Sequence, residues 1–309
     1  MLSKRALRRR KPKPDFDRWI PREKSTWPFQ VFQIYNDELD KNLSSYIPAS
    51  KYVYSNLKKN GALWEDKVEK HFEIEKGKED EFVNLKDWSN AFNAFDNWTN
   101  LNVLMTISST FETYLATVVL IALQSDPGLL LGSSQSIDGI YVLKYGSFSR
   151  LDYDSHVVAC TKGDWGSRIS SYEKLFNSSP PQIKANIADL EAIRKLRNNV
   201  GHAFGRDIEE ARKHAKKSII PIEALSRERV IKYQRLLWKV AKSIDKHLLF
   251  SHIGEFQALN FYHSMYDGLR KDVHASIRAM HFKKQLGQSG VQTAGKLFCK
   301  QLVSFYEAI

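Results

Sequence analysis

The sequence predicts a mainly α-helical fold, and three observations indicate it. Apolar residues recur at steps of three and four positions along several long stretches, which is the period of an amphipathic helix. Runs that favour β-structure are confined to residues 127–165. In a chain of 309 residues, 42% are hydrophobic and 12% aromatic, which is enough for a sizeable core and argues against disorder. We expect two domains, or one helical bundle with large additions.

Residues 1–27 are expected to form a basic, extended leader. Pro12, Pro14 and Pro21 disfavour a helix at the residues before them. More than half of the formal net charge of +12 lies in the first thirteen residues, which hold seven basic side chains and no acidic one. The leader has no apolar core, so it is not a secretory signal. Two interpretations stay open: an arm that contacts nucleic acid, and a solvated or targeting extension.

Residues 28–94 are predicted to form an N-terminal helical extension. One helix runs from Phe29 to about Tyr46, where Phe32, Tyr35, Leu39 and Leu43 keep helical spacing, and a second is expected around 62–72. The aromatic residues that follow repeat every three or four positions, and we expect them to pack in the core rather than to stack on bases. They are Trp88, Phe92, Phe95 and Trp98.

The longest predicted helix runs from about Asn100 to Gln124 and stops at the Asp126-Pro127-Gly128 breaker. Its most apolar run, 114–123, is about half of what a membrane span needs, so no span is expected. Residues 127–165 are predicted to be an insertion. Its β-favouring runs, 139–143 and 156–160, suggest either a small hairpin or an ordered loop that borders a site.

Helical spacing resumes near Gly166, restarts after Pro181 and returns at 226–250. Residues 251–309 are predicted to be a C-terminal helical extension that contains a basic amphipathic helix. Its charged face is interpreted as solvated, with an RNA-phosphate surface as the alternative. The basic residues of this region are Arg270, Lys271, His274, Arg278, His281, Lys283 and Lys284.

The stretch 196–205 carries the residues best suited to chemistry. An apolar stripe of Ile187, Leu190, Ile193, Leu196 and Val200 predicts a helix, with Arg197 beside the stripe and Asn198 and His202 stacked four positions apart. Arginine can donate hydrogen bonds to two phosphate oxygens at once, and histidine can transfer protons near neutral pH. Asparagine can position the phosphate or the imidazole by hydrogen bonds. Gly201 between them would let a phosphate approach the backbone.

These residues resemble the Arg-polar-x-x-x-His signature of the ribonuclease members of the HEPN superfamily, with Arg197, Asn198 and His202 in the signature positions. Three further segments, 108–115, 172–176 and 204–207, look like other parts of that family, so the resemblance covers about residues 95–250. It implies a HEPN-like helical bundle at 95–250 with the insertion 127–165. It also implies a supporting role for Glu112, which orients Arg197 or His202, and Asn199 is a further supporting candidate.

The resemblance implies a metal-independent endoribonuclease that cleaves RNA by attack of its own 2′-OH. One copy supplies one histidine, whereas the acid and base roles need two groups. The resemblance therefore implies a composite site in a homodimer that contains Arg197 and His202 from both subunits. It further implies a role in bacterial defence or as a toxin, with an antitoxin or regulatory protein as a possible partner.

The alternative is a HEPN-like module that binds RNA, a nucleotide or a protein without cutting. Arg197 and His202 are otherwise ordinary favourable cations near a helix end.

No metal site, cofactor or nucleotide loop is expected, because neither the histidines nor the glycines have the required spacing. Cys160 and Cys299 form no disulfide framework, so a reducing cytoplasm is the expected compartment.

Overall fold

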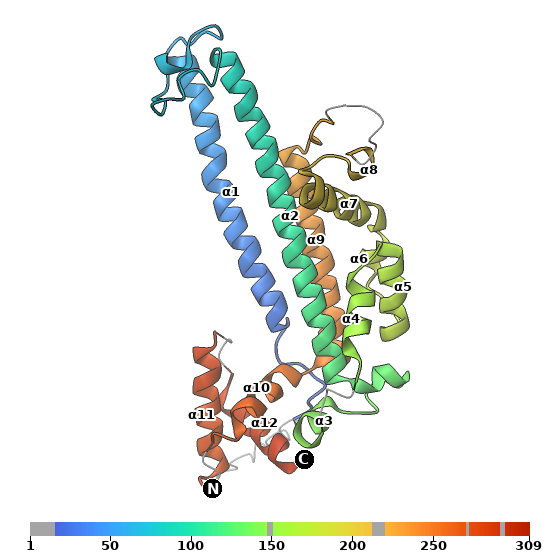
Figure 1. Cartoon of the computed structure of the whole chain (residues 1–309). Coiled ribbons are helices and arrows are strands. Elements are labelled where there is room, and N and C mark those ends of the chain that lie inside the picture. The colour runs from blue at the N-terminus through green and yellow to red at the C-terminus, as the bar shows by residue number, and fades with distance from the viewer. Residues whose placement is uncertain (1–15, 147–150, 212–219, 270–271, 291–293) are drawn as a thin grey trace, which may run out of the picture. The chain divides into compact units, whose positions relative to one another are not determined.

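The protein is all-helical, which confirms the mainly α prediction. A computed structural model describes residues 16–146, 151–211, 220–269, 272–290 and 294–309, and within these ranges there are helices, turns and loops but no strand (Figure 1). Most of the predicted basic leader, residues 1–15, lies outside the described residues. Residues 16–26 form turns, and the first helix begins at Trp27.

The chain divides into two compact units, and each is discontinuous in sequence. The bundle unit comprises Pro28–Val119 and Asp154–Asp245. The terminal unit comprises Met1–Trp27, Leu120–Tyr153 and Lys246–Ile309. The sequence had suggested contiguous boundaries at 28–94, 95–250 and 251–309. Residues 120–153 and 246–309 instead group with the start of the chain.

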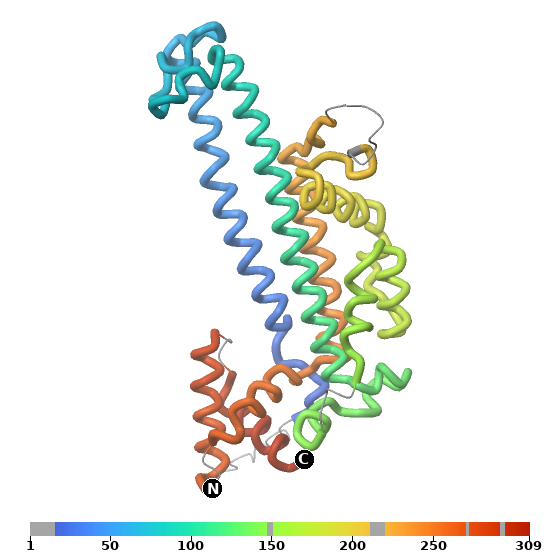
Figure 2. The backbone as a smooth tube through the Cα atoms, viewed as in Figure 1, coloured from blue at the N-terminus to red at the C-terminus, as the bar shows by residue number. Residues whose placement is uncertain are grey.

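Three long helices build the bundle unit: α1 (Trp27–Lys59), α2 (Leu85–Ser125) and α9 (Arg227–Leu248). Figure 2 shows the chain reversing direction between α1 and α2. Aromatic side chains fill their shared core, where Phe32 stacks on Tyr114 with ring centroids 5.4 Å apart. The Tyr114 hydroxyl donates to the Ala241 carbonyl at 3.0 Å and thereby ties α2 to α9. This hydrogen bond satisfies a polar group that is otherwise fully buried.

Helix α1 is longer than predicted, and the predicted helix at 62–72 is wrong. α1 continues through Pro48 to Lys59, whereas residues 60–84 contain only a 3₁₀ turn, Val68–Lys70. Gly61 ends the helical course at φ +68°. The Asp66 carboxylate then accepts hydrogen bonds from the Leu63 amide and the Lys70 ammonium, so local side-chain bonds replace a helical ladder.

Helix α2 is a single helix of 41 residues that contains the aromatic run 88–98. Trp88 and Phe92 stack on each other, with ring centroids 5.0 Å apart, and pack among other aromatic rings. Phe95 and Trp98 are instead exposed, so the expectation of core packing is wrong for these two. α2 is also long and apolar enough to pass a length-and-composition test for a membrane-crossing helix. A buried core helix of a soluble protein passes the same test.

The insertion 127–165 contains helices, and no hairpin is found in its described part. After the 3₁₀ turn Pro127–Leu131, both β-favouring runs lie in helices, α3 (Gly139–Tyr145) and α4 (Tyr153–Thr161). Asp138 caps α3 by accepting a hydrogen bond from the Ile140 amide at 2.9 Å. Burial of Ile140 and Cys160 then outweighs the β-propensity of their neighbours.

The remaining helices of the bundle unit are α5 (Trp165–Phe176), α6 (Pro181–Lys184), α7 (Ile187–Ala203) and α8 (Ile208–Ala211). α7 buries Leu190, Ile193 and Leu196 as predicted. The two ends of the predicted stripe differ, because Ile187 is exposed and Val200 is only half-buried. The buried face therefore covers about two turns, and the C-terminal turn of α7 is open to solvent on its other faces.

The terminal unit is held together by a buried arginine. Arg18 forms an ion pair with Asp138 at 2.8 Å and donates hydrogen bonds to the Ser125 hydroxyl and the Ile253 carbonyl. α10 (Phe256–Tyr266), α11 (Ala275–Gln288) and α12 (Lys296–Ala308) supply the aromatic core of this unit. On the predicted basic helix, Arg278 pairs with Glu307, whereas His281, Lys283 and Lys284 are exposed. Arg270 and Lys271 lie outside the described residues.

Candidate functional site

The predicted site lies on the C-terminal half of α7. Arg197 and Asn198 are both half-buried, and the Arg197 guanidinium donates to the Asn198 Oδ1 atom at 3.2 Å. The side chains of consecutive residues leave a helix about 100° apart. The hydrogen bond nevertheless brings these two together, because one edge of the Arg197 guanidinium donates to the Asn198 Oδ1 atom.

Glu112 of α2 lies between two arginines. Its Oε2 atom is 3.5 Å from an Arg197 nitrogen, and its Oε1 atom is 3.3 Å from an Arg168 nitrogen. Glu112 thus contacts Arg197, as the supporting role requires. The contact from an adjacent helix limits the positions open to the long Arg197 side chain.

Arg168 of α5 was not predicted and is the most buried cation of this cluster, with 5% of its side chain exposed. Its Nε–H donates to the Gly163 carbonyl at 3.0 Å, and its guanidinium lies 4.9 Å from the Trp165 ring centroid. Burial lowers the pKa of Arg168 below its ordinary value, while the Glu112 carboxylate opposes that shift. Glu112 is therefore needed as a counter-charge inside the bundle unit as well as beside Arg197.

His202 lies on the last turn of α7 and is exposed. Among the described residues, none forms a hydrogen bond or ion pair with its imidazole. Apart from its chain neighbours and the nearby backbone of α7, no atom of the described residues lies within 4 Å of the position where a Cβ would stand on Gly201, so this side of the helix is open. His202 and Asn198, one turn apart, thus border an accessible stretch of helix surface.

The chain leaves α7 through two residues in the left-handed region. Phe204 has φ +52° and Gly205 has φ +77°. Glycine favours this conformation, and a Cβ on Gly205 would lie 2.9 Å from the Leu101 Cδ1 atom, so a larger residue would also displace the Leu101 side chain. The Asn199 carbonyl accepts the Gly205 amide at 2.9 Å. Asn199 is therefore placed by the structure at the helix end, where its backbone serves the C-terminal cap.

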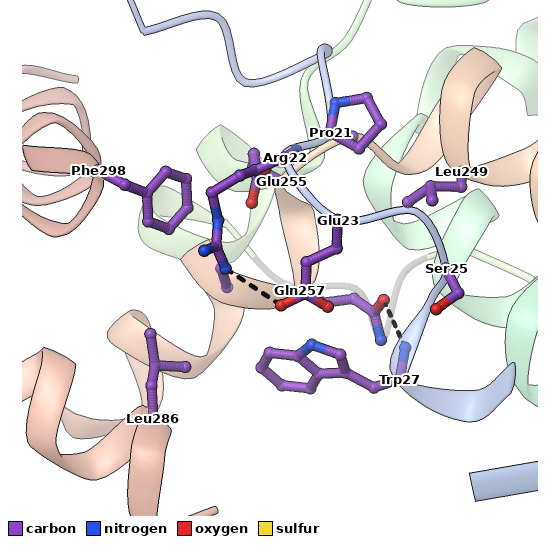
Figure 3. A pocket seen from close by; sticks show the side chains of 12 residues that line it. Pro21, Arg22, Glu23, Ser25, Trp27, Leu249, Glu255, Gln257, Leu286 and Phe298 are labelled. Carbon is purple, nitrogen blue, oxygen red and sulfur yellow. Dashed lines mark hydrogen bonds and ion pairs between the residues drawn. The ribbon is translucent and has the colours of Figure 1, made fainter. Parts of the chain in front are cut away.

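Each unit also contains a small cavity lined by charged side chains. One is a shallow hollow in the bundle unit, bordered by Glu112, Arg168 and Arg197, but His202 does not line it. The other lies in the terminal unit beside Arg22, Trp27 and Glu255 (Figure 3). The Glu255 carboxylate accepts the Arg22 amide there, and burial raises the pKa of Glu255 to about 7. His202 lines neither cavity.

The α7 surface is suited to binding and proton transfer at a phosphate. Arg197 carries a permanent charge and a planar fork of donors, Asn198 adds an amide, and His202 offers an accessible imidazole. Sequence reasoning missed Arg168, because its contact with Glu112 depends on how α2 and α5 pack and no spacing signals it. The chain matches no protein-family model, no curated protein and no solved structure.

Proposed function

We propose that the protein is a metal-independent endoribonuclease that uses Arg197 and His202 on α7. The proposal combines the HEPN-like resemblance of the sequence with the local geometry. Arg197 would stabilise the charge that develops on the phosphate, Asn198 would hold phosphate or imidazole, and Glu112 would position Arg197.

The observation that carries the proposal is the environment of His202. A histidine that serves only the fold is expected to be buried or hydrogen-bonded to other protein groups, whereas this imidazole is exposed and makes no hydrogen bond within the described residues. It lies one turn beyond Asn198, which in turn contacts Arg197. General acid–base catalysis at a phosphate needs an accessible proton-transfer group together with a cation, and the C-terminal half of α7 carries both residue types.

The reaction requires two proton-transfer groups. In the first role, His202 removes the proton of a ribose 2′-OH, the 2′-oxygen bonds to phosphorus, and the bond from phosphorus to the 5′-oxygen breaks. In the second role, a protonated imidazole gives its proton to that leaving 5′-oxygen. The products are a 2′,3′-cyclic phosphate and a 5′-OH end. Because one chain supplies one His202, we propose that a second copy provides the other, through a two-fold arrangement of α7.

Purified protein incubated with mixed RNA tests the proposal. Cleavage is expected in the presence of EDTA, with 2′,3′-cyclic phosphate or 3′-phosphate ends, and DNA of the same sequence should stay intact because it lacks the 2′-OH. His202→Ala and Arg197→Ala should each abolish cleavage while the circular dichroism spectrum stays unchanged. Dependence on added Mg²⁺, or 5′-phosphate products, would contradict the mechanism.

The composite site has its own test. The intact chain can be mixed with an excess of the His202→Ala chain, so that most intact chains lie in mixed dimers that hold a single His202. If the acid and the base come from the two copies, cleavage per intact chain should then fall, whereas a site complete within one chain should keep its activity. A chain that sediments as a monomer at micromolar concentration and still cleaves RNA would contradict the two-fold site.

A further inference from the structure

Beside the α7 surface, the bundle unit exposes three aromatic side chains that the fold does not use. Phe95 is 51% exposed, Trp98 is 37% exposed and Phe204 is 57% exposed. Single exposed apolar residues are ordinary on protein surfaces, but a group of large aromatic rings near cations is typical of a binding surface. We call these three residues the aromatic patch.

Two of the three rings are already stacked. The ring centroids of Phe95 and Trp98 lie 5.5 Å apart, with an angle of 28° between the ring planes. Both side chains project from α2 three residues apart, and so from the same side of the helix. Each ring holds the other in place, and the outer faces and edges of the stacked pair remain exposed.

The third residue, Phe204, follows the C-terminal end of α7, and contacts of its neighbours bring that end close to α2. Gly205, the residue after Phe204, approaches Leu101, which lies three residues after Trp98 on α2. The Gly205 carbonyl also accepts the Glu223 amide at 2.7 Å, and the Glu223 carbonyl accepts the Asn97 side-chain amide at 3.1 Å. Phe204 therefore leaves α7 where α2 carries Trp98.

The patch and the proposed catalytic residues lie on the same side of α2. Trp98 and Glu112 are fourteen positions apart, which places them about 40° apart around the helix axis and about 21 Å apart along it. Glu112 contacts Arg197 on α7, and the end of the same helix carries first His202 and then Phe204 of the patch. His202 itself is two positions from Phe204 in the sequence, so the proposed catalytic histidine lies close to the patch.

The charges near the patch suit a polyanion. The Arg206 guanidinium lies 5.6 Å from the Phe204 ring centroid, and the Arg206 Nε–H donates to the Ile220 carbonyl. Asp96, between Phe95 and Asn97, forms an ion pair with Arg227 at 2.9 Å, which offsets its negative charge. Arginine beside exposed rings favours nucleic acid, whose bases stack and whose phosphates bind the cation.

We propose that Phe95, Trp98 and Phe204 form a stacking surface for unpaired bases of single-stranded RNA that extends from the α7 site. The inference rests on the proposed ribonuclease function and names its substrate class. Bases in a duplex already stack on one another and are not free to stack on protein rings, so double-stranded RNA should not use the patch.

The test uses the full chain with His202→Ala, so that RNA can be bound without being cut. Binding of a short fluorescein-labelled single-stranded RNA is measured by fluorescence anisotropy. Adding Trp98→Ala should weaken binding about tenfold, because the loss of one stacked base lowers affinity by about that factor. Trp98→Phe should retain most of the affinity, because it keeps an aromatic ring. Phe95→Ser keeps the test possible should Trp98→Ala fail to fold.

Trp64→Ala is the matched control, because Trp64 is equally an exposed tryptophan, 51% accessible, but lies in the loop between α1 and α2. It should leave the affinity unchanged. Duplex RNA should bind the parent and the Trp98→Ala variant equally. Single-stranded RNA that binds both proteins with equal affinity would overturn the inference, as would an equal loss for duplex RNA.

Cleavage by the chain with His202 intact separates the two proposals. If that chain cuts RNA and Trp98→Ala cuts it with the same KM, the stacking surface is wrong and the ribonuclease proposal stands. If the chain cuts no RNA but its binding of single strands depends on Trp98, the catalytic proposal is wrong and the surface stands. Absence of both cleavage and binding overturns both.

Discussion

Replacing Glu112 with alanine separates its two roles, as the counter-charge of a buried arginine and as a guide for Arg197. The substitution leaves Arg168, 5% exposed, with the Gly163 carbonyl and the Trp165 ring as its remaining contacts. Breaking a buried ion pair costs about 3 to 5 kcal/mol. Because Glu112 itself is 19% exposed, we expect the lower end, about 3 kcal/mol of unfolding free energy. The more exposed Arg197 contact adds less than about 1 kcal/mol.

A double-mutant cycle with Arg168→Met measures this coupling. Methionine fills a similar volume without a charge, so Glu112→Ala combined with Arg168→Met should regain roughly 2 kcal/mol relative to Glu112→Ala alone. Urea unfolding followed by circular dichroism gives the four free energies. A coupling energy near zero would refute the argument that Glu112 compensates the Arg168 charge.

The same variants also test whether Glu112 positions Arg197. If Glu112 orients Arg197, RNA cleavage should fall about tenfold with Glu112→Ala and should stay low in the stabilised double variant, because Arg168→Met restores folding but not the Arg197 contact. Arg168→Met alone should retain most of the cleavage rate. Recovery of both stability and cleavage in the double variant would assign Glu112 a purely structural role.

Three further predictions concern stability. Glu255 has a pKa of about 7 in the folded protein, above the ordinary value of a carboxyl group. The folded state therefore loses stability relative to the unfolded state as the pH rises from the ordinary value to about 7. Glu255→Gln should remove this pH dependence and raise the melting temperature at pH 8.5 but not at pH 4. Arg18→Met should lower the unfolding free energy by about 3 kcal/mol in urea, because Asp138 loses its buried partner, and an unchanged midpoint would contradict this. Gly205→Ala should lower the unfolding free energy by about 1 to 3 kcal/mol, because Gly205 has φ +77° and the Leu101 side chain is close. Gly201 lies in an open helical position, so Gly201→Ala should leave the unfolding free energy unchanged or raise it in the same assay.

The sequence predicted best the helices whose apolar period is long and uninterrupted. α7 and α9 lie within a few residues of their predicted bounds, because burial of one face dominates their energetics. α1 was predicted to end near Pro48 and does not. The position is exposed, so the Ser44 carbonyl that loses its helical donor remains open to water.

The elements and contacts that the sequence did not predict depend on residues far apart in the chain or on a single helix cap. The 139–143 run is helical because Asp138 starts a helix and Ile140 is buried, and neither fact follows from β-propensity. Arg168 contacts Glu112 across 56 positions, a pairing set by packing of α5 on α2. Trp98 keeps the spacing of a core residue yet is exposed, because periodicity identifies a face of a helix but not what covers it.

The buried Arg18 links the stability of the terminal unit to the order in which the chain is synthesised. Its bond to the Ile253 carbonyl spans 235 positions. At about 5 to 20 residues per second, a ribosome takes roughly 10 to 50 s to make that length. Throughout this interval Arg18 lacks its bond to the Ile253 carbonyl, so the terminal unit is completed only after the bundle unit has been synthesised. A chain that stalls before residue 253 would carry the α7 residues without a completed terminal unit.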